Sequence, residues 1–219
     1  MLDVSINATS PGILGGGGEA VTETTYTGSA TGWTLSNGSG TASAGTEYAV
    51  ALGNGVYVTP VYPTSSHPRI LRSVTTQLAG MMDWSVTFRV VGLMGSTDGR
   101  MMLAVGASDD SRGVEIVLAQ DGTVELGSWI STTYTAAATA AGTLPLDGTG
   151  WCRLLSRGGV ITAQRGTGTS TAQPTSWSQV GGSVVLVGLT PQRLTIFLAQ
   201  WAGTGLAGAI DDITVREGV

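Results

Sequence analysis

The fold of this chain is decided by its last third, which opens with WCRLLSRGG at residues 151–159 and closes with LTIFL at residues 194–198 and AIDDITV at residues 209–215. The first segment has the pattern of a strand that turns at two glycines into a hairpin, and the other two have the pattern of closing strands. No segment with helical periodicity lies between them. The last third therefore predicts an antiparallel, all-β structure.

The clearest single strand lies at residues 84–90, WSVTFRV, where apolar and polar side chains alternate. This period of two is typical of an antiparallel strand with one face in a core. Strand and turn patterns recur roughly every ten residues, as they do in β-sandwiches and jelly rolls. We expect residues 21–219 to form one such sandwich, with a core that includes Trp84, Phe88, Ile116, Leu118, Ile196 and Leu198.

Two segments depart from the simple strand pattern. Strict alternation in residues 210–215 would place Asp211 on the apolar face, which predicts a β-bulge near the paired aspartates. Residues 132–143 are rich in threonine and alanine and contain Tyr134. Alanine favours a helical turn there and threonine opposes it, so this segment is predicted to be a long loop.

Residues 1–20 differ from the rest of the chain. Two apolar residues alternate with polar neighbours, and a run of four glycines at residues 15–18 follows them. Successive glycines give the backbone great freedom, so we interpret this segment as an extended arm on a flexible tether. The alternative is a disordered terminus. The side chains expected to dock the arm on a partner are Val4, Ile6, Ile13 and Leu14.

The composition excludes several classes of function. The formal net charge is −5, and the ten basic residues are all arginines that form no basic run. Binding to a phosphate backbone requires such a run, so no nucleic-acid partner is predicted. No stretch reaches the roughly 20 apolar residues of a membrane span. The start of the chain lacks the basic and apolar regions of a secretory signal, which favours assembly in a cytoplasm over a secreted protein with a cloned start codon.

Candidate catalytic and metal-binding residues are sparse. Cys152 is the only cysteine and His67 the only histidine, which argues against a thiolate or histidine metal site and against a nucleophile–base pair. Cys152 lies in a strand-like run and is expected to be buried. Asp109 and Asp110 could bind calcium from a loop, but paired aspartates are also common in turns. We predict no metal and no cofactor.

The order of several segments resembles the concanavalin A-like lectin/glucanase domains, including laminin-G-like modules. These segments are residues 84–90, 113–118, 121–122, 150–154 and 210–215, and the resemblance covers roughly residues 33–217. It implies an antiparallel jelly-roll sandwich, a fold that carries lectins, hydrolases and structural domains alike. Hydrolases of this family carry two glutamates flanking an aspartate on one strand. Here Glu115 and Glu125 lie on separate predicted strands, so the chain is not expected to be an enzyme.

Aromatic residues are the remaining candidates for a ligand surface. Trp129, Tyr134 and Trp177 lie in or beside predicted loops, where flat rings can stack on sugar faces. The alternative is that they fill or cap the core, which is the common role of tryptophan in sandwiches. Trp33, Trp84, Trp151 and Trp201 have the pattern of core residues; they are not part of the predicted glycan site.

Two classes of function follow from these observations. The first is a virion protein of a bacteriophage, such as a capsid decoration, head-fibre or tail-associated adhesion protein, held to other virion proteins or to its own copies by the arm. The second, the alternative, is a glycan-binding module of a secreted cellular protein in the extracellular space. The glycine-rich, low-charge composition and the arm favour the first. A cell-surface glycan is a possible ligand in either case.

The arm hypothesis predicts that deleting residues 1–18 leaves a folded sandwich that no longer joins its particle or oligomer. A short apolar strand can add to the free sheet edge of a partner, where main-chain hydrogen bonds supply the affinity. Sedimentation of the truncated and full chains, alone and with the particle, measures this. Unchanged assembly of the truncated chain would show that docking lies on the sandwich itself.

Overall fold

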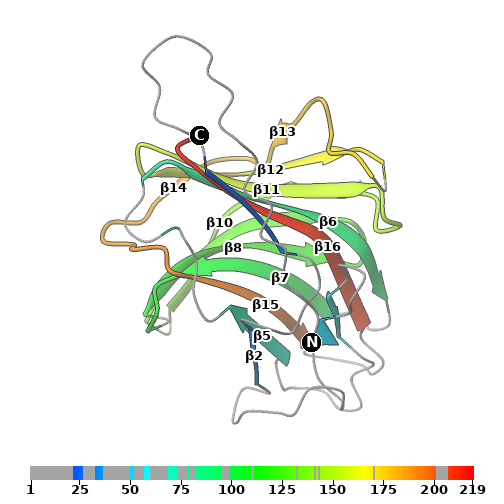
Figure 1. Ribbon diagram of the computed structural model, residues 1–219, viewed down its shortest axis with the longest axis horizontal. Coiled ribbons are helices and arrows are strands. Elements are labelled where there is room, and N and C mark those ends of the chain that lie inside the picture. The colour runs from blue at the N-terminus through cyan, green and yellow to red at the C-terminus, as the bar shows by residue number, and fades with distance from the viewer. Residues whose placement is uncertain are drawn as a thin grey trace.

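The computed structural model describes residues 22–26, 33–36, 50–51, 57–59, 69–73, 78, 82–94, 99–109, 111–131, 133–140, 142, 144–169, 171–200 and 207–219. These residues form two antiparallel β-sheets that pack face to face, as Figure 1 shows. The predicted all-β sandwich is confirmed. Within the described ranges there is no helix with the length and hydropathy needed to cross a membrane. The predicted arm and tether, residues 1–20, and His67 and Asp110 lie outside the described residues.

One sheet has nine strands in the order β13-β12-β11-β6-β16-β4-β3, with β1 also paired to β16 and β14 to β12. Its long central strands are β6 (Trp84–Met94), β16 (Ala207–Glu217), β11 (Gly150–Arg157) and β12 (Val160–Thr167). The shorter ones are β1 (Thr22–Tyr26), β3 (Val50–Ala51), β4 (Tyr57–Thr59), β13 (Ser178–Gln179) and β14 (Val184–Val185). The hairpin predicted from residues 151–159 is the β11–β12 pair.

The other sheet has seven strands in the order β10-β9-β8-β7-β15-β5-β2. They are β10 (Thr133–Ala140), β9 (Val124–Ile130), β8 (Arg112–Ala119), β7 (Gly99–Gly106), β15 (Arg193–Gln200), β5 (Arg69–Ser73) and β2 (Trp33–Ser36). Strand β10 corrects the sequence prediction of a loop at residues 132–143. Main-chain pairing with β9 stabilises an extended conformation of residues 133–140. This pairing, and not the local propensity of alanine and threonine, determines the structure of the segment.

The core lies between the two sheets and consists of apolar side chains from alternate positions of their strands. The predicted core residues Trp84, Phe88, Ile116, Leu118 and Ile196 are all buried there. The side chain of Leu198 lies outside the described residues, as do those of Trp33 and Trp201. Cys152 is buried in this core as expected. Trp151 is also buried, but outside this core: it lies opposite Arg89 on the outer face of the nine-stranded sheet, where its indole N–H donates to the carbonyl of Thr169 at 3.1 Å. One face of each long strand is thereby used for packing, and the other faces outward.

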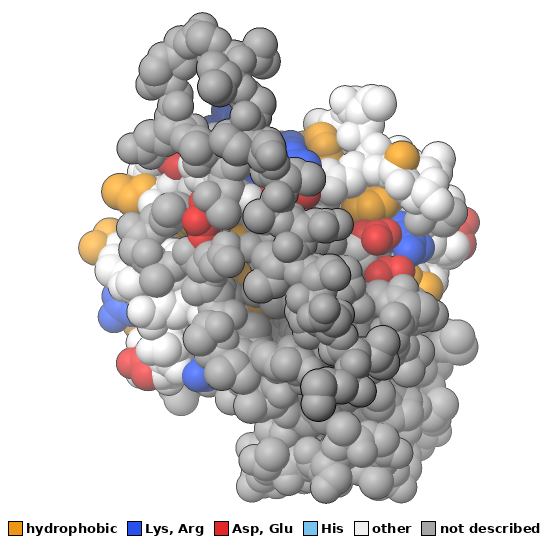
Figure 2. Space-filling model, viewed as in Figure 1, with side chains coloured by type: hydrophobic (Ala, Val, Ile, Leu, Met, Phe, Trp, Pro, Cys, Tyr) orange, Lys and Arg blue, Asp and Glu red, His pale blue; other side chains and the backbone are white. Residues whose placement is uncertain are grey.

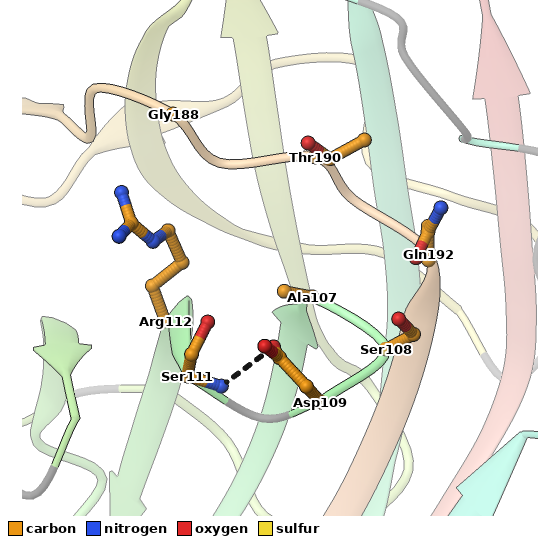
Figure 3. Close-up of a pocket in the computed structure, with 8 residues that line it drawn as sticks. All are labelled: Ala107, Ser108, Asp109, Ser111, Arg112, Gly188, Thr190 and Gln192. Atoms are coloured by element: carbon orange, nitrogen blue, oxygen red, sulfur yellow. Dashed lines mark hydrogen bonds between the residues drawn. The ribbon is translucent and has the colours of Figure 1, made fainter.

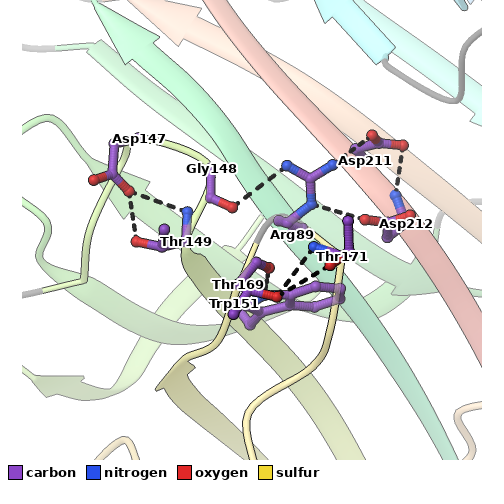
Figure 4. A network of polar contacts seen from close by, with 9 residues as sticks. All are labelled: Arg89, Asp147, Gly148, Thr149, Trp151, Thr169, Thr171, Asp211 and Asp212. Atoms are coloured by element: carbon purple, nitrogen blue, oxygen red, sulfur yellow. Dashed lines mark hydrogen bonds and ion pairs between the residues drawn. The ribbon is translucent and has the colours of Figure 1, made fainter.

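The bulge predicted near the paired aspartates is present in β16, where the register with β6 shifts between Asp211 and Thr214. Asp212 takes a left-handed conformation with φ 51°. Arg89 on β6 joins both carboxylates, with Nη2 and Nε each donating at 2.7 Å to Asp211 and Asp212 (Figure 4). Its guanidinium also donates to the carbonyl of Gly148 at 3.4 Å. The bulge turns both aspartates toward one cation, which offsets the cost of placing Asp211 in a partly buried position.

Phe88 provides a direct test of the core. Its side chain is fully buried between the sheets, so Phe88→Ala should lower the free energy of unfolding by about 3–5 kcal/mol. Val160→Ala is the matched control, because Val160 is 43% exposed and should change stability by less than about 0.5 kcal/mol. Chemical denaturation followed by tryptophan fluorescence measures both values. Equal effects of the two substitutions would contradict the placement of this core.

Candidate functional site

Two aromatic side chains lie together on the outer face of the seven-stranded sheet. Trp129 near the end of β9 is directly opposite Tyr134 on β10 and Gly113 on β8, and Gly113 is opposite Gly106 on β7. Directly opposed residues share a face, and Val114, which follows Gly113 along β8, points into the core. Gly106, Gly113, Trp129 and Tyr134 therefore form a row that faces away from the nine-stranded sheet.

Glycines on this face let both rings lie against the backbone. A Cβ atom at Gly113 would lie 2.2 Å from Cη2 of Trp129, and one at Gly127 would lie 2.2 Å from the hydroxyl oxygen of Tyr134. Neither position could hold a side chain without displacing the ring. Tyr134 is 46% exposed and Trp129 is half-buried, so each keeps part of its surface available to a ligand.

Two carboxylates accompany the rings. Glu115 on β8 is opposite Gly127 on β9, and Glu125 lies two residues earlier on β9, so the glutamates are diagonal neighbours on the outer face. The hydroxyl of Tyr134 donates a hydrogen bond to Oε1 of Glu125. Burial, and then the charge of Glu125, raises the pKa of Glu115 to about 7. Burial and the bond to Glu125 raise the pKa of Tyr134, which keeps its hydroxyl a donor.

A polar groove of about 380 Å³ opens at the end of this sheet (Figure 3). It lies between the β7–β8 loop and the segment that leads into β15, and is lined by Ala107, Ser108, Asp109, Ser111, Arg112, Gly188, Thr190 and Gln192. Arg112 donates from Nη1 to the carbonyl of Val187 at 2.6 Å, and Ser131 donates from its main chain to that of Ser111 at 2.5 Å. The second bond links the groove to Ser131, which follows β9.

The calcium hypothesis gains no support from the geometry at Asp109. Its Oδ1 accepts a hydrogen bond from the main chain of Ser111 at 3.0 Å, and this bond lowers the pKa of the carboxyl group. Such a bond is the ordinary role of aspartate in a turn. In the ranges that the structure describes, no three His, Cys, Asp or Glu side chains gather in a way that could hold a metal ion. Burial also raises the pKa of the Cys152 thiol.

Trp177, the third predicted glycan-binding residue, lies apart from the other two. It immediately precedes β13 and packs on the outer face of the nine-stranded sheet, where the Arg153 guanidinium lies 4.4 Å from its ring centroid. Arg153 is held in turn by a 2.9 Å bond from Nε to Oε1 of Gln164. The structure thus brings Trp129 and Tyr134 into one site and places Trp177 on the opposite side of the sandwich.

Glu115 and Glu125 were not among the predicted binding residues. From the sequence they were considered only as a catalytic pair, which their placement on separate strands argued against. The signal was present, since each glutamate stands between apolar residues of an alternating strand, at 114–116 and 124–126. That pattern places both on the outer face. Their diagonal contact depends on the register of β8 and β9, which the pattern does not give.

Comparison with known proteins identifies the fold. No protein-family model matches this sequence, and no curated protein is similar to it in sequence. Solved structures do match the fold: the chain has the two-sheet, concanavalin A-like sandwich of the legume-type lectins. Nothing in these comparisons supports a phage origin.

Three of these structures show the range of the likeness. The exoplasmic/lumenal domain of VIP36, in its Ca2+/Man3GlcNAc-bound form, is 10% identical with a TM-score of 0.56, over 89% of this chain and 88% of that one. The lectin from Bauhinia forficata in complex with GalNAc is 11% identical with a TM-score of 0.56, over 90% and 99%. The carbohydrate-binding module CBM66 from Bacillus subtilis is 11% identical with a TM-score of 0.53, over 85% and 96%.

The buried carboxyl of Glu115 predicts a pH dependence of stability. Its pKa is raised from 4.5 to about 7 on folding, so its stabilising contribution is full below about pH 4.5 and is lost as the pH rises through 7. Relative to Glu115→Gln, the wild type should lose about 3 kcal/mol of unfolding free energy between these limits. Comparing the two proteins cancels the other titrating groups. Denaturation curves at several pH values measure the difference, and parallel pH profiles would contradict this assignment.

Proposed function

We propose that this chain is a non-catalytic glycan-binding domain, and that the ligand binds to the outer face of the seven-stranded sheet at Trp129 and Tyr134. The observation that carries the proposal is the pair of aromatic rings resting on glycines, with a carboxylate beside them. A sugar ring has one apolar face and a rim of hydroxyl groups, and this site offers a partner for each.

The chemistry of the site divides between stacking and hydrogen bonding. Trp129 and Tyr134 supply flat apolar area at a low cost in side-chain entropy. Glu125 keeps acceptor capacity beyond the bond from Tyr134, because a carboxylate has several lone pairs. The groove adds hydroxyl, amide and guanidinium groups, which can fix the orientation of a second sugar unit.

The similar structures support this proposal by their ligands. The VIP36 domain is bound to Man3GlcNAc, the Bauhinia forficata lectin is in complex with GalNAc, and the Bacillus subtilis domain is a carbohydrate-binding module. At these identities the likeness establishes the fold alone. It therefore supports the site only together with the aromatic and polar residues of this chain.

We propose that the domain binds glycans without hydrolysing them, because its two glutamates are not placed as a catalytic pair. Glycosidases place two carboxyl groups on either side of the bond that they cleave. Glu115 is only 7% exposed, and Glu125 is engaged by the hydroxyl of Tyr134. The two carboxyl groups therefore do not present a free acid and a free nucleophile to one substrate.

The virion hypothesis stays a prediction. It depends on the arm at residues 1–20, which lies outside the described residues, and it gains no support from the comparisons. The alternative, a secreted glycan-binding module, agrees better with the site. Location in a virion or in the extracellular space is also a prediction.

The proposal predicts that Trp129→Ala weakens binding at least about tenfold, or 1.4 kcal/mol, without unfolding the sandwich. The ring packs outside the core, on Gly106 and Gly113, so its loss removes the proposed ligand contact and leaves the core intact. Trp177→Ala is the matched control, because it removes an equal aromatic surface from the opposite sheet. An array of plant, animal and bacterial oligosaccharides identifies the best probe, and calorimetry with that probe measures the affinities.

Gly127→Ala gives a second test that removes no aromatic or polar group. The atoms nearest to a Cβ atom at this position all belong to the Tyr134 side chain, so the substitution displaces that ring and should also weaken binding of the same oligosaccharide. Loss of binding in Trp177→Ala with full binding in Trp129→Ala would move the site to the nine-stranded sheet. The absence of binding to every oligosaccharide on the array would contradict the proposed function.

A further inference from the structure

Glu115 is a buried carboxyl group without a partner, and it lies beside the aromatic rings of the seven-stranded sheet. Its side chain forms no hydrogen bond or ion pair with a residue of the described chain. Burial, and then the charge of Glu125, raises the pKa of the group, and no cation of the described ranges lowers it. A buried charge is costly unless it is paired. A ligand that brings a cation to this point would therefore stabilise the ionised carboxylate.

Three oxygen-bearing side chains meet at this point of the outer face. Gly127 on β9 is directly opposite Glu115, and the atoms nearest to a Cβ atom on Gly127 belong to the hydroxyl end of Tyr134. That hydroxyl donates to Oε1 of Glu125, two residues before Gly127. Besides burial and this bond, the charges of both glutamates raise the pKa of Tyr134. The hydroxyl oxygen thus lies close to both carboxyl groups.

The surroundings leave room for a ligand at these oxygens. Glu115 belongs to a row of directly opposed residues whose other members are small. They are Ala104 on β7, Gly127 on β9 and Ala136 on β10. The bond between Tyr134 and Glu125 lies at the exposed surface. A ligand therefore reaches these two side chains from solvent, with the charge of Glu115 close by.

We propose that the ligand of this site is an amino sugar with a free amine, whose ammonium group binds between Glu125, Glu115 and the hydroxyl oxygen of Tyr134. This inference rests on the proposed glycan-binding function and names the class of sugar. An ammonium group has three N–H donors and no acceptor. Each donor meets one acceptor here, because the hydroxyl of Tyr134 gives its only proton to Glu125. Bonds from a cation to carboxylates are also stronger than neutral ones.

Other classes of ligand fit the three oxygens less well. Uronic and sialic acids bring carboxylates, which both glutamates repel. Neutral sugars can donate hydroxyl groups to Glu125 but leave the charge of Glu115 unpaired. An N-acetylated sugar offers one amide donor and no charge. A metal ion lacks a third ligand of the usual kind, since no three His, Cys, Asp or Glu side chains gather within the described ranges.

The attraction for an amine is local to this pair of carboxyl groups. On the face that Figure 2 presents, acidic and basic side chains of the described residues lie interspersed. The formal net charge of −5 therefore does not form one broad acidic surface on that face. A preference for an amine has to come from Glu115 and Glu125, and single substitutions of these residues test it.

The test compares two probes that differ only at the amine. They are the chitosan tetramer, whose sugars carry free amines, and the chitin tetramer, in which every amine is acetylated. Calorimetry with the full chain measures both affinities at low ionic strength and at a pH that keeps the amines protonated. The wild type should bind the chitosan tetramer at least about tenfold more tightly, because hydrogen bonds to charged groups contribute more than neutral ones. Tetralysine, a cation without a sugar, should bind more weakly than the chitosan tetramer.

Glutamine substitutions remove each charge and keep the shape of the side chain. Glu125→Gln should bring the two tetramers to within about twofold of each other, and Glu115→Gln should reduce the preference in part. Glu23→Gln is the matched control, because it removes the same charge from β1 of the nine-stranded sheet and should keep the full preference. Reading the ratio of affinities cancels any change that weakens both probes equally. Circular dichroism verifies that each variant is folded.

The outcomes separate the choice of sugar from the glycan function. Binding of neutral oligosaccharides without a preference for the chitosan tetramer would overturn the amine inference and leave glycan binding intact. Binding of no oligosaccharide would overturn both. A preference that survives Glu125→Gln would place the amine elsewhere and overturn the inference. Tetralysine bound as tightly as the chitosan tetramer would do the same, since the site would then bind a cation without its sugar.

Discussion

The sandwich depends on one apolar layer, to which alternate residues of nearly every long strand contribute. Trp84 and Phe88 from the nine-stranded sheet meet Ile116 and Leu118 from the seven-stranded sheet within it. Because side chains alternate along a strand, filling this layer commits one face of each sheet to the core and turns the other outward. The two outer faces have consequently taken different characters. One carries the Arg89 ion pairs with Asp211 and Asp212, and the other carries aromatic rings on a glycine surface.

Glycine is what makes the second face suitable for a ligand. A sheet with ordinary side chains at positions 113 and 127 would hold the rings of Trp129 and Tyr134 upright or push them aside. Without those side chains, the rings lie against the backbone and the hydroxyl of Tyr134 reaches Glu125. The burial of Glu115, which raises the pKa of its carboxyl group, indicates that this face holds a polar group at some cost in stability. Costs of this kind are common where a surface serves binding rather than packing.

Much of the fold follows from the sequence, because it depends on local periodicity. The alternation at residues 84–90, the hairpin at 151–159 and the bulge near Asp211 were all predictable, since each is encoded within a few neighbouring residues. Strand β10 was not predictable, because its threonines and alanines show no alternation of apolar and polar side chains. Its extended conformation depends on pairing with β9. The site was half predictable for the same reason. Trp129 and Tyr134 could be named as candidates, but their direct pairing depends on β10, the strand that the sequence does not indicate. The separation of Trp177 depends on which sheet its segment packs against.

The proposed ligand lies on the rings of Trp129 and Tyr134 on the seven-stranded sheet and not elsewhere on the sandwich. A titration of protein labelled with 15N at the tryptophan indoles, with the oligosaccharide that binds best on the array, tests it directly. Each indole N–H gives one signal in a heteronuclear correlation spectrum, and single substitutions assign the signals. A ligand bound at this site should shift the Trp129 signal in proportion to the bound fraction. The signals of Trp177, on the opposite sheet, and of Trp84, in the core, should stay in place. A shift of the Trp177 signal with an unmoved Trp129 signal would contradict it.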